Sequence, residues 1–252
     1  MRRQQGVTVF DLSGKTALVT GAGQGVGAGI AKVLADAGAS VLVNDFHAER
    51  AERTASAVGG RALPFDVADL ASVEKAVEAA GQVDILVNNA GIPPSMRPVQ
   101  FRELPPEEWA PYIDVNLYGV LNCVKATIDG MCDRGWGRVI TISSGAGTTG
   151  LGIGVSIYAA GKGAGISFMR HLAHECGRYG VTANSLALGL MQRDDPRSEE
   201  SRTVTKGLER GIPVGRLGTG EDVGYACAYL ASDEASWMNG QTIGLNGGSV
   251  TS

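Results

Sequence analysis

The chain has 252 residues, with 22 Lys and Arg against 26 Asp and Glu, so its formal net charge is −4. Hydrophobic residues make up 44% and charged residues 19%, a composition that excludes disorder as the main state. The mildly acidic balance also argues against a nucleic-acid partner or an anionic membrane surface. Glycine is in excess, with 37 residues, which predicts sharp turns or close backbone contacts.

Apolar runs alternate with amphipathic stretches from residue 15 to the C-terminal end. The runs predict seven strands, at 15–20, 40–45, 62–66, 83–88, 138–143, 181–186 and 241–245. The stretches between them predict helices at 26–37, 48–58, 71–80, 106–134, 157–179 and 222–231. This alternation predicts an α/β fold: a single Rossmann-type, doubly wound domain with a seven-stranded parallel sheet flanked by helices.

The domain organisation follows from the same pattern. Residues 1–11 are expected to form a loose N-terminal arm and residues 12–252 a single catalytic domain. The long, charged stretch 188–215 follows the sixth predicted strand, so it is interpreted as a substrate lid or, alternatively, as a surface excursion without a role. No secretion signal and no credible membrane span are present in the sequence, which predicts a cytoplasmic protein.

The first predicted strand runs into a glycine-rich turn, Thr20 to Gly27 (TGAGQGVG), and a predicted helix follows directly. Glycines let the backbone bend sharply and approach a pyrophosphate, which binds at the N-terminus of the following helix. A glycine-rich turn between a strand and a helix therefore predicts a dinucleotide site.

The second predicted strand ends in Asp45, which is placed to bind the adenosine ribose hydroxyls and to repel a 2′-phosphate. Neither Gln24 nor Phe46 supplies a cation, so NAD is expected in preference to NADP. The alternative is that Asp45 only caps the next helix. The charges of that helix, which include Arg50 and Arg53, are interpreted as a solvated face.

Tyr158 and Lys162 lie four residues apart on a predicted helix and so share one face. An ammonium beside a phenol stabilises the phenolate and is expected to lower the pKa of Tyr158 towards neutrality, as a general acid or base requires. Ser143 and Ser144 end the fifth predicted strand at the same edge of the sheet. His171 and His174 have no third ligand of suitable type, so no metal site is expected.

These motifs, in their order and spacing, resemble the classical short-chain dehydrogenase/reductase family from about residue 12 to residue 248. The resemblance rests on the glycine-rich turn, Asp45, Asp66-Val67, Asn88-Asn89-Ala90-Gly91, Asn116, Ser144 and the pair Tyr158 and Lys162. It implies four catalytic residues: Tyr158 as acid and base, Lys162 as its partner and a ligand of the nicotinamide ribose, Ser144 holding the reacting oxygen, and Asn116 holding a water for proton relay. Ser144 lies one residue further from Tyr158 than is usual, which leaves Ser143 as the competing choice.

The resemblance also implies contacts for the two ligands. Cofactor-binding residues would be Gly21, Gln24, Gly25, Val26, Asp45, Phe46, Asp66, Val67, Asn89, Ala90, Gly91, Tyr158, Lys162 and Met191. Substrate-binding residues would be Ser144, Pro93, Ile153 and Leu190. The usual Thr near Met191 is missing, so that contact would come from the backbone.

Together these features predict an NAD(H)-dependent short-chain alcohol dehydrogenase or ketoreductase. Because the expected substrate residues are mostly apolar, the substrate is predicted to be a hydrophobic secondary alcohol or ketone, whether alicyclic, aromatic, steroid-like or 3-oxoacyl. The alternative is a catalytically silent sensor or scaffold that binds a dinucleotide, although the intact catalytic set favours an enzyme. The resemblance further implies a homotetramer, with the helices at 106–134 and 157–179 in its interfaces.

Overall fold

The computed structural model describes residues 9–93, 96–192, 207 and 209–251. Its sheet has seven strands in the order β3-β2-β1-β4-β5-β6-β7, and every neighbouring pair is parallel. The strands are β1 (Thr16–Val19), β2 (Ser40–Val43), β3 (Arg61–Ala62), β4 (Ile85–Asn88), β5 (Gly137–Ser144), β6 (Val181–Leu188) and β7 (Thr242–Leu245). The predicted doubly wound parallel sheet is confirmed.

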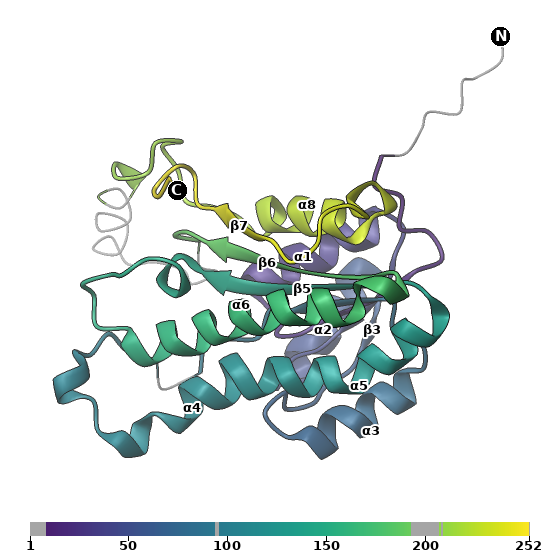
Figure 1. Ribbon diagram of the computed structural model, residues 1–252, viewed down its shortest axis with the longest axis horizontal. Helices are drawn as coiled ribbons and strands as arrows, with labels where there is room; N and C mark the ends of the chain where they lie inside the picture. Colours follow the sequence, from purple (N-terminus) through teal and green to yellow (C-terminus); the bar gives the residue numbers. More distant parts are fainter. Residues whose placement is uncertain (1–8, 94–95, 193–206, 208, 252) are drawn as a thin grey trace, which may run out of the picture.

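Helices cover both faces of the sheet. Figure 1 shows α3 (Leu70–Ala80), α5 (Gly119–Arg134) and α6 (Ser156–Cys176) together on the near face. The other face is covered by α1 (Gly25–Asp36), α2 (Ala48–Val58) and α8 (Gly220–Ala231). Each face has its own apolar cluster: on β4, Val87 joins one cluster and Leu86 the other. Strands buried on both sides explain why the apolar runs in the sequence are continuous rather than alternating.

Two predicted elements differ from the structure. Strand β3 is only two residues long, because its partner β2 ends at Val43; beyond that point the Asn44 side chain, rather than a strand, donates to the Leu63 and Phe65 carbonyls. The predicted helix 106–134 is continuous from Ala110 to Arg134 as α4 (Ala110–Ile113), the π-helical turn η3 (Asp114–Tyr118) and α5, whereas its first residues, Pro106–Glu108, form a 3-10 turn.

The π-helical turn lies against α6 at a glycine. A Cβ added to Gly161 would lie 2.9 Å from the Cβ of Asn116, so the two helices approach closely only because this position lacks a side chain. Asn116 is thereby turned inward and is only 1% exposed. A π-helical turn inside an α-helix is frequently found at functional sites.

The expected N-terminal arm and the expected lid each lie partly outside the described residues. Of the expected arm, residues 1–8 lie outside them, whereas the Phe10 ring packs edge-on against Tyr229 of α8, with centroids 5.4 Å apart. Of the expected lid 188–215, residues 193–206 and 208 lie outside them. The residues on either side are held by backbone contacts: Met191 forms a parallel β-bridge with Gly218, and the Val214 N–H donates to the Gly247 carbonyl.

The strand order places a topological switch point beside β1. The chain leaves β1 for β2 and β3 on one side and returns to β4 on the other. In open parallel sheets, ligands bind in the crevice that this reversal creates at the carboxyl ends of the strands. The residues that directly follow β1, β2, β4, β5 and β6 are therefore the ones that can form a site.

Candidate active site

The glycine-rich turn after β1 forms one wall of this crevice. Gly21 and Gly25 adopt positive φ angles of 60° and 56°, which only glycine accepts easily. A Cβ on Gly21 would lie 2.9 Å from the Ala90 Cα, so the turn also presses against the chain that follows β4. Helix α1 then begins at Gly25 and Val26, and the side chain of its N-cap, Gln24, makes no capping hydrogen bond. The positive end of this helix fits a pyrophosphate.

The chain after β4 is fastened to the turn by side chains. The Thr20 hydroxyl accepts hydrogen bonds from the Asn89 and Ala90 N–H groups at 3.0 and 3.1 Å. The Asn89 amide donates to the Thr20 and Gly21 carbonyls at 2.9 and 3.0 Å. The side-chain donors of Asn89 are directed to the backbone of the turn, and its predicted contact with the cofactor stays a prediction.

Asn44 is a residue of the site that the sequence analysis missed. Its side-chain oxygen accepts from the Gly21 N–H at 3.2 Å, and its amide donates to the Leu63 and Phe65 carbonyls. It thereby joins the ends of β1, β2 and β3. A short polar residue directly after an apolar strand was the available signal, because such side chains satisfy the backbone groups that a turn leaves unpaired.

Asp45 stands at the carboxyl end of β2 and is 6% exposed. One carboxylate oxygen accepts from the Gly23 N–H at 3.2 Å and the other from the His47 N–H at 2.9 Å. A Cβ on Gly23 would lie 2.6 Å from the first of these oxygens, so Gly23 leaves the room that the carboxylate needs. Phe46, the next residue, is 69% exposed beside it. The carboxylate is held where a ribose bound at the turn would meet it.

Helix α2 contributes a cation to the same turn. Arg53 is exposed, as expected for a solvated face, and its Nη2 also donates to the Gly23 carbonyl at 3.4 Å. Arg50, three residues earlier, has its Cβ 2.5 Å from the position that a Gly23 Cβ would take. A positive charge therefore reaches the turn from a neighbouring helix, although neither Gln24 nor Phe46 supplies one.

Asp66 and Val67 follow β3 and are held by the protein itself. The Asp66 carboxylate accepts from the Ala68 N–H at 2.9 Å, and the Val67 carbonyl accepts from the Asn122 amide of α5 at 2.9 Å. These bonds hold the segment beside the crevice, which is where the resemblance placed the adenine contacts.

Met191 lies at the far side of the crevice, directly after β6. Its parallel bridge to Gly218 is made by the Leu190 carbonyl and the Gln192 N–H, at 3.0 and 2.8 Å. The backbone N–H and carbonyl of Met191 itself therefore take no part in this bridge. A backbone contact from Met191 to a ligand stays compatible with the geometry.

Ser144, Tyr158 and Lys162 meet at the carboxyl end of β5. Tyr158 and Lys162 lie in the first turns of α6, and the hydroxyls of Ser144 and Tyr158 are joined by a hydrogen bond. The Lys162 ammonium is 5.9 Å from the centre of the Tyr158 ring and donates to the Ile142 carbonyl at 2.8 Å. The Ser143 hydroxyl, in contrast, donates to the Lys162 carbonyl at 3.1 Å. Ser144 is thus the serine that the fold brings to the phenol.

Burial decides the acidity of the two titratable groups. It raises the pKa of Tyr158, and the hydrogen bond from Ser144 opposes only part of this effect. It lowers the pKa of Lys162 from 10.5 to about 8. The expected lowering of the Tyr158 pKa by Lys162 is not found in this structure, where burial raises that pKa and only the Ser144 hydrogen bond opposes it. The phenol therefore holds its proton at neutral pH, while the ammonium can exchange one near it.

Asn116 and Gly91 complete this cluster. The Asn116 amide donates to the Tyr112 carbonyl at 2.8 Å, and its side-chain oxygen is buried without a partner among the described residues. A Cβ on Gly91 would lie 2.8 Å from that oxygen and would collide with the Lys162 ammonium. Gly91 thus leaves a small polar space between the two groups. This unmatched acceptor and the space beside it fit a ligand that brings hydroxyl donors, such as a ribose.

The residues expected around the substrate lie at the mouth of the site. Ile153 and Leu190 are 57% and 48% exposed, whereas Pro93 is buried. The long loop after Ser144 is anchored at Gly154, which has a φ of 72° and accepts from the Val99 N–H at 2.8 Å. A small hollow beside Tyr158 is lined by Arg97, Leu104, Tyr112, Gly154, Val155, Ser156 and Ile157.

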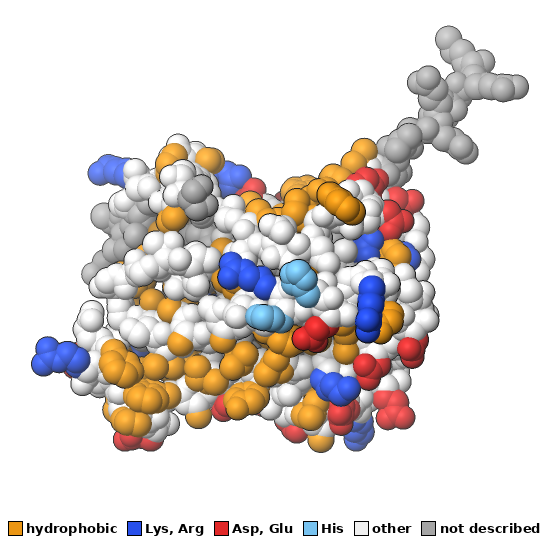
Figure 2. Space-filling model, in the orientation of Figure 1, with side chains coloured by type: hydrophobic (Ala, Val, Ile, Leu, Met, Phe, Trp, Pro, Cys, Tyr) orange, Lys and Arg blue, Asp and Glu red, His pale blue; other side chains and the backbone are white. Residues whose placement is uncertain are grey.

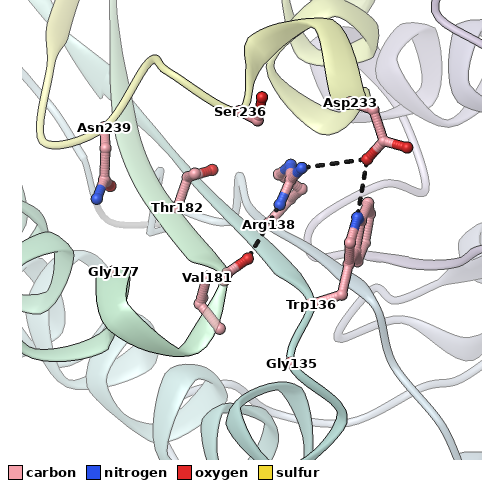
Figure 3. Close-up of a pocket in the computed structure, with 10 residues that line it drawn as sticks. Gly135, Trp136, Arg138, Gly177, Val181, Thr182, Asp233, Ser236 and Asn239 are labelled. Carbon is pink, nitrogen blue, oxygen red and sulfur yellow. Dashed lines mark hydrogen bonds and ion pairs between the residues drawn. The ribbon is translucent and has the colours of Figure 1, made fainter.

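A hollow of about 320 Å³ lies at the opposite edge of the sheet, where β5 and β6 begin (Figure 3). Arg138, 3% exposed, donates there to the Gly137 and Gly180 carbonyls at 2.9 and 3.2 Å. The Asp233 carboxylate accepts from Arg138 at 3.3 Å and from the Trp136 indole N–H at 2.9 Å. These bonds hold the segment after α8 against the sheet, so this hollow is explained by its structural role.

Known proteins are similar to this chain in sequence and in fold. Residues 21–250 match the family model described as enoyl-(acyl carrier protein) reductase. The 3-oxoacyl-[acyl-carrier-protein] reductase FabG of Escherichia coli is 39% identical over 247 residues, covering 95% of this chain and 98% of the relative. The acetoacetyl-CoA reductase of Rhizobium meliloti is 36% identical over 241 residues, covering 93% and 98%.

A solved structure gives the same result. The gluconate 5-dehydrogenase of Burkholderia cenocepacia, in complex with NADP and tartrate, superposes with a TM-score of 0.84 at 34% identity, covering 95% of this chain and 96% of that one. Within the described ranges, every helix is too short or too polar to cross a bilayer. The chain belongs to the classical short-chain dehydrogenase/reductase family of oxidoreductases, which use a nicotinamide dinucleotide.

Proposed function

We propose that the protein is an NAD(H)-dependent oxidoreductase that interconverts a hydrophobic secondary alcohol and its ketone. The observation that carries this proposal is the cluster of Ser144, Tyr158 and Lys162 beside the glycine-rich turn, at the carboxyl edge of one sheet. When bound, the nicotinamide dinucleotide supplies the hydride acceptor or donor. The residues of the chain supply the proton and orient the reacting oxygen.

In ketone reduction, Tyr158 donates its phenolic proton to the carbonyl oxygen. Its raised pKa keeps that proton in place at neutral pH, which suits the reductive direction. The Ser144 hydroxyl, which is hydrogen-bonded to Tyr158 in the structure, turns its one proton to the same carbonyl oxygen when the ketone is bound and orients it. In alcohol oxidation, the proton moves the opposite way.

Lys162 and Asn116 restore the proton of Tyr158. A pKa of about 8 lets the Lys162 ammonium release and regain a proton near neutral pH. The Asn116 side-chain oxygen, which lies with that ammonium beside Gly91, would accept a hydrogen bond from a water, and this water would carry the proton between Lys162 and solvent. Asn116 is thus proposed as a residue that holds the relay rather than one that touches the substrate.

NAD is the proposed cofactor because of Asp45. A carboxylate at the ribose accepts hydrogen bonds from the 2′- and 3′-hydroxyls and repels a 2′-phosphate. The similar gluconate 5-dehydrogenase was solved with NADP, so the preference needs a direct measurement. Replacement of Asp45 by Ala should raise the ratio of kcat/KM for NADP over NAD. An unchanged ratio would remove Asp45 from this role.

The substrate is proposed to be apolar next to the reacting carbon, because exposed apolar side chains such as Ile92, Ile153 and Leu190 surround the mouth of the site. Arg97, the nearest candidate cation for an acyl carrier, already bonds both oxygens of Glu108 at 2.8 Å. A second candidate is a 3-oxoacyl thioester, which is favoured by the names of the two relatives.

A panel of alicyclic, aromatic and steroid ketones together with acetoacetyl-CoA, followed by the loss of NADH absorbance, tests the function and the substrate class together. Turnover of any ketone that is abolished in Tyr158→Phe supports the proposal, provided that this variant still binds NADH. If NADH binds but no ketone is turned over, the catalytically silent sensor or scaffold is the better description.

A homotetramer is proposed from the family resemblance. Hydrophobic side chains gather in a band over the region of α4, α5 and α6 (Figures 1 and 2), and Tyr118, at the start of α5, is 52% exposed. An apolar face of this kind is typical of an interaction surface. Light scattering at micromolar concentration should give four copies, and a monomer would refute the proposal.

The segment 188–215 is proposed to cover the substrate, since its fastened ends flank the carboxyl edge of the sheet. Cofactor and substrate together should slow its cleavage by a protease. Cleavage at an unchanged rate would count against a lid.

A further inference from the structure

We propose that Arg53 of α2 forms a subsite for the 2′-phosphate of NADP beside Asp45, so that the protein binds both dinucleotides and Arg53 sets their ratio. This inference rests on the proposed dinucleotide site. It assigns a specificity-determining role to a residue that lies outside the glycine-rich turn and after the strand that carries Asp45.

Gly23 brings the two opposite charges together. Its N–H donates to the Asp45 carboxylate at 3.2 Å, and its carbonyl accepts from the Arg53 guanidinium at 3.4 Å. The carboxylate and the guanidinium therefore approach the same residue of the turn from two sides. A ribose held by Asp45 would have its 2′ position within the reach of a long arginine side chain.

The two charges are not equally available to a ligand. Both oxygens of Asp45 already accept backbone N–H groups, from Gly23 and His47, and the residue is 6% exposed. Arg53 is exposed and makes one long hydrogen bond, and none of the ion pairs among the described residues includes it. Its remaining donors suit the oxygens of a phosphate, which arginine binds in a bidentate manner.

The other charged groups near Arg53 do not cancel it. Glu49 and Glu52 share the first turns of α2, but neither forms an ion pair with Arg53 in the structure. Arg50, one turn earlier, lies beside Gly23 through its Cβ and is a second cation on the same helix. Helix α2 therefore brings positive charge near Asp45, although neither Gln24 nor Phe46 is a cation.

A purely structural role for Arg53 would be to support the turn through the Gly23 carbonyl. That role predicts equal losses of affinity for nucleotides with and without a 2′-phosphate. A 2′-phosphate subsite predicts a loss for the phosphorylated nucleotide alone. The probes 2′,5′-ADP and 5′-ADP differ only in this phosphate, so the pair separates the two roles without any measurement of turnover.

The experiment is calorimetric titration of the full chain with each probe. Arg53→Gln should weaken 2′,5′-ADP about tenfold and leave 5′-ADP within about twofold, because one charge-assisted contact is lost. The salt dependence of 2′,5′-ADP binding should also become shallower. Arg61→Gln is the matched control, since the Arg61 guanidinium likewise donates to a backbone carbonyl, that of Ala80, at 3.0 Å. It should change neither affinity.

Three results would overturn the proposal. Equal weakening of both probes by Arg53→Gln would make Arg53 a support of the turn. Binding of 5′-ADP without measurable binding of 2′,5′-ADP by the unaltered protein would mean that no 2′-phosphate subsite exists. Binding of neither probe would overturn the proposed dinucleotide site itself and the subsite with it.

Discussion

Replacement of Lys162 by Met should change how the stability of the protein depends on pH. The side chain is buried, and its pKa in the folded state is about 8 against an ordinary value of 10.5. Above pH 10.5 neither the folded nor the unfolded chain is protonated at this position. As the pH falls towards 8, the unfolded chain takes up the proton first, so the folded state loses relative stability. Below pH 8 both states are protonated and the loss is complete.

The size of the effect follows from the difference between the two pKa values. At 1.36 kcal/mol per unit, the full loss is about 3 kcal/mol, and about 2 kcal/mol of it should be recovered between about pH 7 and about pH 9.5. Methionine has a similar volume and no charge, so the variant lacks this recovery. It does leave the Ile142 carbonyl without its donor, which costs about 1 to 3 kcal/mol at every pH.

The assay is urea unfolding of both proteins over this pH range at one protein concentration, without cofactor. Other titrating groups contribute equally to both proteins, so the difference between their free energies of unfolding isolates Lys162. As the pH rises from about 7 to about 9.5, the free energy of unfolding of the unaltered protein should increase by about 2 kcal/mol relative to that of Lys162→Met. A difference that stays constant, or that moves the other way, would refute the argument that burial lowers the pKa of Lys162.

Three further changes test individual contacts. Gly161→Ala places a Cβ 2.9 Å from that of Asn116, so it should lower the free energy of unfolding by about 1 to 3 kcal/mol in a thermal or urea denaturation, and an unchanged stability would show that the helices can separate freely. Ser144→Ala should lower kcat/KM about a hundredfold or more in the ketone assay, whereas Ser143→Ala should retain most activity; the reverse order would assign the role to Ser143. Asp233→Ala removes the acceptor of a buried guanidinium and an indole N–H, and because its side chain is 81% exposed the expected loss is only about 1 kcal/mol, measured by urea unfolding against the unaltered protein.

The sequence by itself determined the fold class. Continuous apolar strands must be covered on both faces, and strands that alternate with helices must run parallel, so little beyond local pattern is needed for that inference. It also determined the order of the motifs, because the glycine-rich turn, Asp45, Asn116 and the pair Tyr158 and Lys162 are recognised by type and spacing. Boundaries were less certain where they depend on a neighbouring element, as the end of β3 depends on the end of β2.

Only the tertiary structure decided which groups meet. Spacing left Ser143 as a competitor of Ser144, and the fold separates the two: the Ser143 hydroxyl bonds the Lys162 backbone, whereas the Ser144 hydroxyl bonds Tyr158. The direction of the Tyr158 pKa depends on burial, which a local motif does not contain. Arg53 reaches Gly23 across 30 residues of chain, a contact that exists only once α2 packs beside the turn. Distances and desolvation arise from packing, and for that reason they could not be predicted from the order of residues.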